Sequence, residues 1–316
     1  MRAIVYDRFG GSDVLELRDI NRPTPDEHQV LINVHYAAVN PIDWKLREGL
    51  YKNLLEFRFP VVPGWDVSGV IAKTGSAIRN LEVGDRVYAM AVSQPISVGT
   101  YAEQTLASES VIGRAPQTIS LAKAAGVPLA ATAARDALFR LGHITEGQKV
   151  LIHQGAGGVG CYAIQLAKQV GAYVYTTCST RNISYVKSFG ADCVIDYTRE
   201  DFVKVVSTHH AEGLDMVLDG VGGETFLRSH SVTKQGGWII TMGDFPNESL
   251  AKQYGIQTAF LDSTANGDFL NTLANDIDTG RIKVPETEEL SLEQAAEAQE
   301  KSQGGHVRGK IVLKII

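Results

Sequence analysis

Three glycines at fixed spacing are the residues in this chain that point most directly to chemistry. Gly155, Gly157 and Gly160 fit the pattern G-x-G-x-x-G. In this pattern the first glycine makes a tight turn, the second lets the backbone approach a pyrophosphate, and the third allows close helix–strand packing. Free N–H groups at the start of the following helix then face the phosphate. The complete turn is Gly155, Ala156, Gly157, Gly158, Val159 and Gly160. We predict that it binds a dinucleotide.

The residues on either side of the turn support this interpretation. Lys149–His153 is a short apolar, β-branched run that predicts a buried strand. After Gly160 the apolar residues recur at helical spacing, and Gly171 is placed to end that helix. The strand–turn–helix order separates the fingerprint from a glycine turn that binds nothing.

The end of the next predicted strand, Tyr173–Cys178, indicates which dinucleotide is bound. An NAD-specific enzyme places an Asp or Glu there to bind the ribose hydroxyl, whereas this chain has Ser179 and Arg181. Because a guanidinium binds phosphate in a planar, bidentate way, we predict NADP(H) with its 2′-phosphate. The alternative is that Arg181 is merely solvated and Ser179 caps a helix. Tyr197 either lies against the adenosine or is a half-buried surface tyrosine.

Short apolar strands alternate with helical stretches through the middle of the chain. This alternation predicts a parallel sheet covered on both faces, a Rossmann-type doubly wound domain over residues 120–265. Gly220 and Gly243 lie just beyond the carboxyl ends of two strands, where such sheets bind ligands. The further strands are expected at 193–196, 214–218 and 238–241, and the helices at 185–189, 201–207 and 225–233.

The two ends of the chain have a different pattern from its middle. Residues 1–119 contain many short strand-like runs separated by glycine turns, which predicts a mostly β domain. The last fifty residues offer a helix, Leu292–Gln303, with Ser291 and Gln294 as a capping box and Gly304 as its end. A final strand, Lys310–Ile316, follows, so residues 266–316 are expected to complete the first domain. The strand-like runs are 1–6, 14–17, 29–36, 67–74 and 86–90.

Composition limits the classes of function. The 316 residues are 44% apolar and 21% charged with a net charge of −6, and the absence of a basic run argues against a nucleic-acid partner. No long apolar stretch or charged leader is present, so neither a membrane span nor a secretory signal is expected. Three cysteines without close spacing indicate a reducing compartment, and we expect a cytoplasmic protein.

Several short motifs occur in order along the chain, and together they carry a family resemblance. They are residues 38–43 (AVNPID), 59–66 (FPVVPGWD), 81–87 (LEVGDRV), 99–103 (GTYAE), 128–132 (PLAAT), the glycine turn, and 305–312 (GHVRGKIV). In these the sequence resembles the medium-chain dehydrogenase/reductase superfamily, and within it the zinc-independent quinone oxidoreductases and related enone reductases. The resemblance implies an α/β protein with a GroES-like, mostly β catalytic domain split around the Rossmann domain. It also implies a homodimer.

The resemblance further implies that no metal is bound. Zinc enzymes of this superfamily carry cysteine and histidine ligands, which zinc requires at tetrahedral geometry. This chain has no cysteine before Cys161, and at the corresponding positions it has Asn40 and Gly64-Trp65-Asp66. Asp66 therefore has no metal to support, and no role is predicted for it.

Without a Lewis acid, the chemistry that remains is hydride transfer to an acceptor that is already electron-poor. The chain is expected to be an NADPH-dependent oxidoreductase acting on quinones or on the C=C bond of α,β-unsaturated carbonyls. The oxyanion that develops needs a hydrogen-bond donor, and the proton could come from a tyrosine, a chain of waters or bulk solvent. The alternative is a non-catalytic NADPH-binding redox sensor or structural protein on the same fold.

The resemblance also suggests which residues surround the nicotinamide. Asn40 and Tyr51 are the candidate catalytic donors, although Tyr51 could equally be a packed aromatic. Asp43 is expected beside the cofactor, where it orders the loop, and Thr132 beside the carboxamide. The remaining expected contacts are Lys310, which would close the site, and Phe260 and Leu261, which would line the nicotinamide or the dimer edge.

Overall fold

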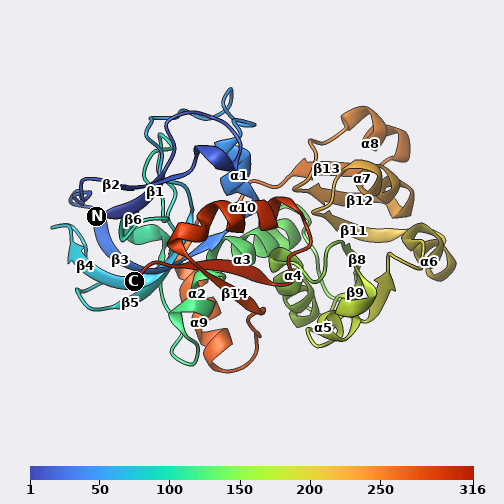
Figure 1. Cartoon of the computed structure of the whole chain (residues 1–316). Helices are drawn as coiled ribbons and strands as arrows, with labels where there is room; N and C mark the ends of the chain where they lie inside the picture. Colours follow the sequence, from blue (N-terminus) through green and yellow to red (C-terminus); the bar gives the residue numbers. More distant parts are fainter. The chain divides into compact units, whose positions relative to one another are not determined.

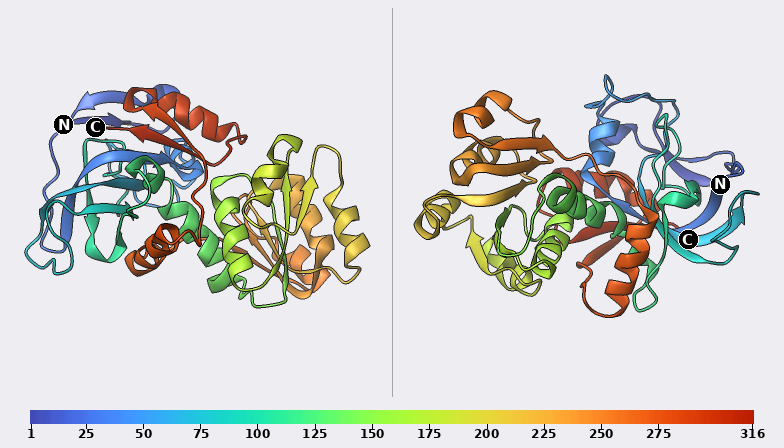
Figure 2. Two further views of the ribbon diagram at one scale, coloured as in Figure 1. Left: turned by 90° about the horizontal axis from the view of Figure 1, so that it is seen from below. Right: turned by 180° about the vertical axis from the view of Figure 1, so that it is seen from behind.

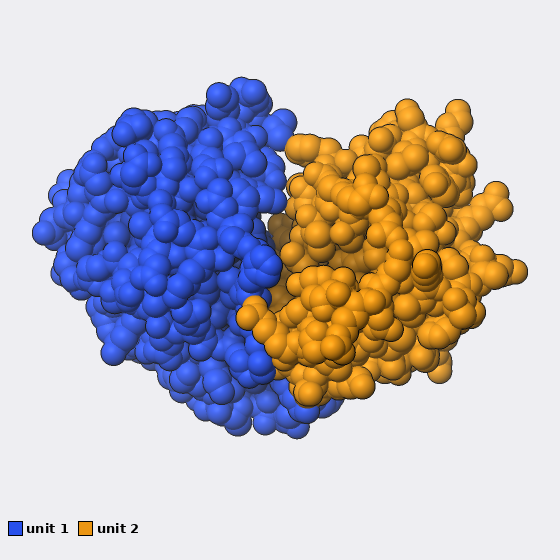
Figure 3. All heavy atoms as spheres, turned by 45° about the vertical axis from the view of Figure 1, so that its right-hand side comes forward, with its two compact units in different colours: residues 1–129, 265–316 blue, residues 130–264 orange.

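The chain forms two compact units. The computed structural model describes all 316 residues. Unit 1 comprises Met1–Leu129 and Ala265–Ile316, and unit 2 comprises Ala130–Thr264 (Figure 3). The first boundary lies after Leu129 and not after residue 119. The reason is that the short helix α2 (Leu121–Ala125) packs in unit 1, where Ala122 and Ala125 form a buried cluster with Ala38 and Val312.

Unit 2 is built on a six-stranded sheet whose strands are all parallel. The sheet order is β10-β9-β8-β11-β12-β13. Counted along the unit, this is third, second, first, fourth, fifth, sixth, which is the order of a Rossmann fold. The predicted doubly wound sheet is therefore confirmed. The strands are β8 (Lys149–Ile152), β9 (Tyr173–Cys178), β10 (Cys193–Asp196), β11 (Leu214–Asp219), β12 (Thr233–Thr241) and β13 (Gln257–Phe260).

Helices flank this sheet (Figure 2). α4 buries every residue from Cys161 to Ala167, and Gly171 follows it with φ +80. The helix expected at 225–233 ends earlier, at Ser229, because a 3₁₀ turn (His230–Val232) leads directly into β12. No helix of the chain is both long enough and apolar enough to cross a membrane. The helices are α3 (Pro128–Arg135), α4 (Gly158–Gln169), α5 (Ile183–Lys187), α6 (Phe202–His209), α7 (Gly223–Ser229) and α8 (Glu248–Tyr254).

Unit 1 is organised around one long strand, β3 (Gln29–Val39), whose alternating residues Val30, Ile32 and Val34 are completely buried. The sheet order is β14-β15-β3-β4-β5-β7, with β6 also paired to β3 (Figure 1). All pairings are antiparallel except that of β14 with β15. The other strands are β4 (Asp66–Thr74), β5 (Arg86–Met90), β6 (Gln104–Ser108) and β7 (Ile112–Arg114).

A separate two-stranded sheet joins β1 (Arg2–Val5) to β2 (Glu16–Asp19). The strand expected at 14–17 begins later, because Ser12–Val14 forms a 3₁₀ turn that buries Val14 in an apolar cluster. The helices of this unit are α1 (Pro41–Arg47), α2, α9 (Gly267–Asp278) and α10 (Ala295–Gln303).

The C-terminal segment belongs to unit 1, as the sequence predicted. β15 (Lys310–Lys314) lies between β14 (Thr287–Ser291) and β3, with Ile311 opposite Val39. The predicted capping box of Ser291 and Gln294 is present, but it opens a single 3₁₀ turn that precedes α10. The left-handed residue after α10 is Gly305, with φ +75, and not Gly304, which stays right-handed.

The contact between Tyr88 on β5 and Leu270 on α9 offers a test of how the returning segment is held. The buried Tyr88 hydroxyl donates to the Leu270 carbonyl at 2.5 Å. Tyr88→Phe leaves that carbonyl without its donor, so we expect the free energy of unfolding to fall by about 1–2 kcal/mol in chemical denaturation. Tyr254→Phe, at an exposed tyrosine of unit 2, is the control and should change it by less than about 0.5 kcal/mol. Equal losses in both variants would contradict this role of Tyr88.

Candidate dinucleotide site and a buried polar network

The glycine turn of unit 2 is shaped by close contacts with strand β9 and with its own backbone. A Cβ atom on Gly155 would lie 2.0 Å from Thr176 Oγ1, and one on Gly160 would lie 2.3 Å from the Gln154 carbonyl oxygen. The left-handed residue of the turn is Gln154, with φ 57, and not one of the glycines. Gly155 and Gly160 are therefore required because the backbone packs too closely for any side chain.

The helix that follows begins without a side-chain cap. Gly157 is the N-cap residue of α4, and Gly158, Val159 and Gly160 form its first turn. The first N–H groups of a helix have no partner within the helix, and they carry the positive end of its dipole. This end of α4 is therefore suited to a pyrophosphate, as the fingerprint predicts.

Two more glycines lie at the same edge of the sheet. Gly220 follows β11, the strand beside β8, and a Cβ there would lie 2.8 Å from Gln154 Oε1. The strand order reverses between β8 and β11, and ligands of open α/β sheets bind at such a reversal. Gly243 packs against the backbone of Gly222, the next loop along this edge. The turn and Gly220 thus lie together, at the place where a dinucleotide fits.

The residues predicted for the 2′-phosphate lie at the end of β9. Ser179 Oγ accepts a hydrogen bond from Asn182 Nδ2 at 3.2 Å, so its own hydroxyl hydrogen is available to a ligand. Ser179 occupies an N-cap position but makes no side-chain capping bond. Arg181 is exposed, and Tyr197, after β10, is 54% exposed.

The sequence analysis did not anticipate a carboxylate beside these residues. Asp196, at the end of β10, accepts hydrogen bonds from the Thr180 hydroxyl and from the Thr198 hydroxyl (2.7 Å) and N–H (3.0 Å). The bond from Thr180 is the main cause that lowers the pKa of Asp196. Because Asp196 takes up both threonine hydroxyls, Ser179 and Arg181 remain the residues predicted for the phosphate. The signal in the sequence that could have indicated this carboxylate is the position of Asp196 at the end of the predicted strand 193–196, which pairs with β9.

The predicted nicotinamide contacts of unit 2 occupy two places. Thr132, on α3, is 1% exposed, and its Oγ1 has no hydrogen-bond partner in the protein, as expected for a group that binds a carboxamide. Phe260 ends β13 and stacks on Phe245 at a centroid distance of 4.9 Å, and Leu261 beside it is buried. The uncapped helix, the close-packed glycines and the unpartnered Thr132 hydroxyl all fit a nicotinamide dinucleotide.

In unit 1 the site begins at the N-terminus of α1. Asn40 is the N-cap residue, Pro41 holds the first helical position, and the Asn40 N–H donates to Asp43 Oδ2 at 2.8 Å. The Tyr101 hydroxyl donates to the same oxygen at 2.9 Å. Asp43 and Tyr101 are 1% and 0% exposed, so this start of the helix is fixed by hydrogen bonds inside the unit.

The Asn40 side chain joins Asp66 to Lys310. Asn40 Nδ2 donates to Asp66 Oδ2 at 3.0 Å, and Asn40 Oδ1 accepts from Lys310 Nζ at 2.5 Å. Lys310 also donates to the Val39 carbonyl at 3.1 Å, and the Leu129 N–H donates to Asp66 Oδ1 at 2.8 Å. We call Asn40, Asp43, Asp66 and Lys310 the polar network. It unites three of the predicted residues with Asp66, for which the sequence suggested no role.

Burial controls the electrostatics of the polar network. It raises the pKa of Asp43 to about 7 and that of Asp66 to about 6. It also lowers the pKa of Lys310, against the attraction of the two carboxylates. Lys310 Nζ lies 4.0 Å from Asp66 Oδ2, and this charge is the first opposing effect on Asp66. On Asp43 the opposing effects are led by the Asn40 and Tyr101 hydrogen bonds.

Tyr51 lies apart from the polar network. It is half-buried after α1 and packs on an apolar cluster that includes Leu46, Val61 and Ile96. Burial is the cause that raises the pKa of its hydroxyl. This placement is compatible with both readings of Tyr51, the hydrogen-bond donor and the packed aromatic. No group of three or more His, Cys, Asp or Glu side chains is arranged to hold a metal ion.

Comparison with known proteins identifies the family. Residues 26–117 match the alcohol dehydrogenase GroES-like domain, and residues 189–313 match the zinc-binding dehydrogenase family. Among curated relatives, an NADPH-dependent alkenal/one oxidoreductase of Arabidopsis thaliana is 36% identical over 99% of this chain and 79% of its own length. A 2-methylene-furan-3-one reductase of Solanum lycopersicum is 35% identical over 99% of this chain and 79% of its own length.

A solved structure supports the same assignment over the complete fold. The quinone oxidoreductase of Coxiella burnetii superposes with a TM-score of 0.89 at 35% identity, covering 100% of this chain and 99% of the other. The similarity extends through both units and through the glycine turn. The chain therefore belongs to the medium-chain dehydrogenase/reductase family, in the group of the quinone oxidoreductases and alkenal/one reductases.

Proposed function

We propose that this protein is an NADPH-dependent reductase of quinones or α,β-unsaturated carbonyls, and that it acts without zinc. The observation that carries the proposal is the end of β9, where Ser179 and Arg181 stand in place of an acidic residue, next to the uncapped glycine turn. The names of the relatives, which include alkenal/one and quinone reductases, point to the same acceptors. NADPH, when bound, supplies the hydride.

The protein has to orient the acceptor, exclude water and stabilise the oxyanion that forms. In the polar network the Asn40 amide is already bonded to Asp66 and Lys310. We therefore propose that Asn40, Asp43 and Lys310 hold the nicotinamide end of the site in a fixed arrangement. Tyr51 is then the proposed side-chain donor to the oxyanion. Thr132 is proposed for the carboxamide, Tyr197 for the adenosine end, and Gly220, Gly243, Phe260 and Leu261 for the walls of the cofactor site.

The proposal also includes an oligomeric state and a location in the cell. We propose a homodimer, supported by the open edge of the unit 2 sheet at β13, where Phe245 is 64% exposed and stacks on Phe260. We propose a cytoplasmic location on the ground that none of Cys161, Cys178 and Cys193 forms a disulfide, although some relatives carry chloroplastic names.

Turnover distinguishes this function from its rival, an NADPH-binding sensor on the same fold. Purified protein is mixed with NADPH and a panel of small quinones and enones, and the loss of NADPH absorbance is followed. Oxidation of NADPH with at least one acceptor supports the reductase. Tight NADPH binding without oxidation by any acceptor would support the sensor instead.

The first prediction from this function concerns Arg181. Arg181→Ala should weaken NADPH binding by about 1–3 kcal/mol, because a charge-assisted bond to the 2′-phosphate is lost, and should leave NADH binding nearly unchanged. Lys204→Ala, at an exposed cation on α6, is the matched control and should alter neither. Titration of both cofactors decides the matter, and equal losses for NADPH and NADH would refute the assignment.

The second prediction concerns metal. Protein purified without added zinc should contain far less than one zinc per chain by elemental analysis, and its rate should be unchanged after dialysis against a chelator, because no thiolate or histidine cluster is present to hold the ion. Stoichiometric zinc, with activity that disappears on its removal and returns on its addition, would contradict the prediction.

The third prediction concerns Tyr51. Tyr51→Phe should lower kcat for an enone by about 100-fold, the typical effect of losing one preorganised oxyanion donor. The loss for a quinone should be smaller, because the oxyanion of a hydroquinone is already stabilised by its aromatic ring. Tyr254→Phe serves as the control. If KM rises for both acceptors while kcat is unchanged, Tyr51 contributes only to binding.

A further inference from the structure

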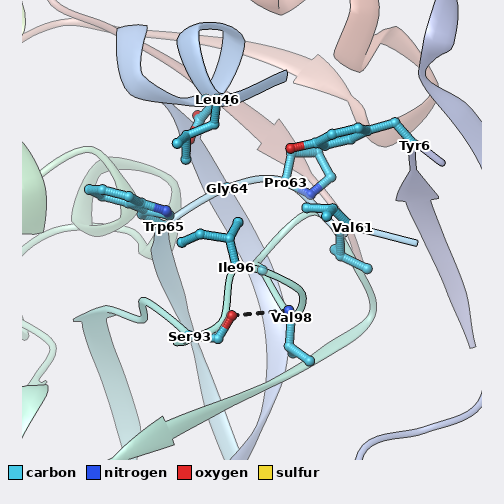
Figure 4. A pocket seen from close by; sticks show the side chains of 12 residues that line it. Tyr6, Leu46, Val61, Pro63, Gly64, Trp65, Ser93, Ile96 and Val98 are labelled. Atoms are coloured by element: carbon cyan, nitrogen blue, oxygen red, sulfur yellow. Dashed lines mark hydrogen bonds between the residues drawn. The ribbon is translucent and has the colours of Figure 1, made fainter. Parts of the chain in front are cut away.

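A small cavity lies inside unit 1 beside the polar network. It has a volume of about 10 Å³, room for a single water molecule. Figure 4 shows Leu46, Trp65 and Ile96 directed toward it from one side and Tyr6 and Val61 from the other. These walls belong to the apolar cluster on which Tyr51 packs, so the cavity adjoins the proposed oxyanion donor. Asp43 is the one carboxylate that lines it.

The two oxygens of Asp43 have different surroundings. Oδ2 accepts from the Asn40 N–H and from the Tyr101 hydroxyl, so both of its neighbours are donors. Oδ1 is buried and has no hydrogen-bond partner in the protein. A proton on this carboxyl group must therefore reside on Oδ1, because Oδ2 is already committed as an acceptor. An unpartnered buried polar atom beside a cavity of this size is a site for one water molecule.

Charged and titratable side chains from several segments of unit 1 influence Asp43. Asp66 on β4 carries a like charge, and its repulsion adds to the effect of burial in raising the pKa of Asp43. Lys310 on β15 opposes this effect from the far side of Asn40. The hydroxyls of Tyr6 and Tyr101 are both influenced by the Asp43 charge, and Arg47 influences Tyr6. Arg47 itself is bonded to Glu48 and Gln299, so Asp43 has no cation of its own.

We propose that Asp43 is the proton donor in enone reduction, and that the proton on Oδ1 reaches the substrate through one water molecule in the cavity. The proposal rests on the function proposed above and names the source of the second hydrogen. It assigns separate roles to two side chains: Tyr51 stabilises the oxyanion, and Asp43 protonates carbon.

The step balances in the following way. Hydride addition to the β-carbon, with NADPH as the reductant, leaves an enolate. The Asp43 Oδ1–H bond breaks, the cavity water relays the proton, and a C–H bond forms at the α-carbon. Asp43 is left as a carboxylate, which the Asn40 N–H and the Tyr101 hydroxyl stabilise. Solvent then returns the proton. A quinone needs no proton on carbon, because its reduced oxygens exchange protons with water.

The pKa of Asp43 agrees with this role. Burial raises it to about 7, so the group is protonated at slightly acidic pH and can both donate and recover a proton near neutrality. The raised pKa also has a consequence for stability. Because the folded protein keeps a proton that the unfolded chain releases near pH 3.8, the contribution of Asp43 is fully present below about pH 4 and is lost as pH rises to about 7.

Asp43→Asn is the first test, because an amide can keep both bonds at Oδ2 while placing an N–H group where the acid proton stood. We expect kcat/KM for an enone to fall by about 100-fold, the usual contribution of a general acid, and kcat/KM for a quinone to fall clearly less, through the altered order of the nicotinamide end alone. Wild-type kcat/KM for the enone should decline above about pH 7, and the variant should lose this decline. Equal losses for both acceptors, or an unchanged pH profile, would overturn the proposal.

Asp136→Asn provides the matched control. Asp136 is also a buried carboxylate, 1% exposed, but it is paired with Arg135 at 2.6 Å and lies outside the polar network. This variant should lose stability through the broken ion pair and keep the wild-type pH profile of kcat/KM. A control that also loses the decline above pH 7 would show that the profile reports stability and not Asp43.

Two further measurements hold even if Asp43→Asn folds poorly. Tyr101→Phe removes a donor that favours the ionised carboxylate, so it should raise the pKa of Asp43 and move the decline of kcat/KM to higher pH. Infrared spectra of the wild type should show the carbonyl band of a protonated carboxyl group that disappears as pH rises through neutrality, and that is weaker in Asp43→Asn. A decline that moves to lower pH, or no such band, would contradict the proposal.

Failure of the proposed function has a different signature. Wild-type protein that oxidises NADPH with no quinone and no enone would overturn the reductase function itself, whatever the infrared spectra show. Wild-type turnover of both acceptors together with an unaffected Asp43→Asn variant would leave the reductase intact and remove only Asp43 as the proton source.

Discussion

The buried ammonium group of Lys310 is the interaction on which the site in unit 1 depends. Its Nζ bonds to the Val39 carbonyl and to Asn40 Oδ1, so it joins the last strand of the chain to the N-terminus of α1. A charge out of water costs several kcal/mol unless it is paired and hydrogen-bonded. Asp66 and Asn40 provide this compensation. The position of the Asn40 side chain, and through its backbone that of Asp43, is therefore set by a residue from the opposite end of the chain.

The site in unit 2 depends on a different constraint, the closeness of its backbone. Gly155 and Gly160 are required because Thr176 and Gln154 occupy the space that a side chain would take. This packing brings the end of β8 and the start of α4 together, so the first N–H groups of the helix remain uncapped for an anion. The site in unit 1 thus depends on a buried ammonium group that is paired and hydrogen-bonded, and the site in unit 2 depends on glycines that carry no side chain.

The contrast explains how much could be predicted from sequence. The glycine turn, the parallel sheet predicted from alternating strands and helices, and the return of the C-terminal segment follow from local pattern, and the structure has them. The left-handed glycine after α10, Gly305 in place of Gly304, and the late start of β2 differ from the prediction by one or two residues, because neighbouring residues share the same turn chemistry. The boundary after Leu129 was missed because α2 packs its alanines on Ala38 and Val312 of unit 1, a long-range contact that no local pattern shows.

Longer-range features escaped sequence reasoning for a physical reason. Asp66 acquires its role from Asn40 and Lys310, which lie 26 residues before it and far along the chain after it. Asp196 matters because β10 lies beside β9, and no spacing in the sequence encodes that neighbour. In both cases a carboxylate ended or began a strand, a pattern too common to single out one residue.

The polar network also connects stability with chemistry. With both carboxylates ionised it would hold two negative charges and one ammonium, an imbalance that burial makes unfavourable. One proton restores neutrality. Asp66 has Lys310 nearby and donors at both oxygens, whereas Asp43 has a free Oδ1, so the proton belongs on Asp43. Burial strengthens the hold on this proton, whereas the hydrogen bonds that Oδ2 accepts from Asn40 and Tyr101 favour its release, and the pKa of Asp43 comes to about 7. A group kept neutral by the fold is thereby suited to give up a proton to a substrate carbanion and to recover it from solvent.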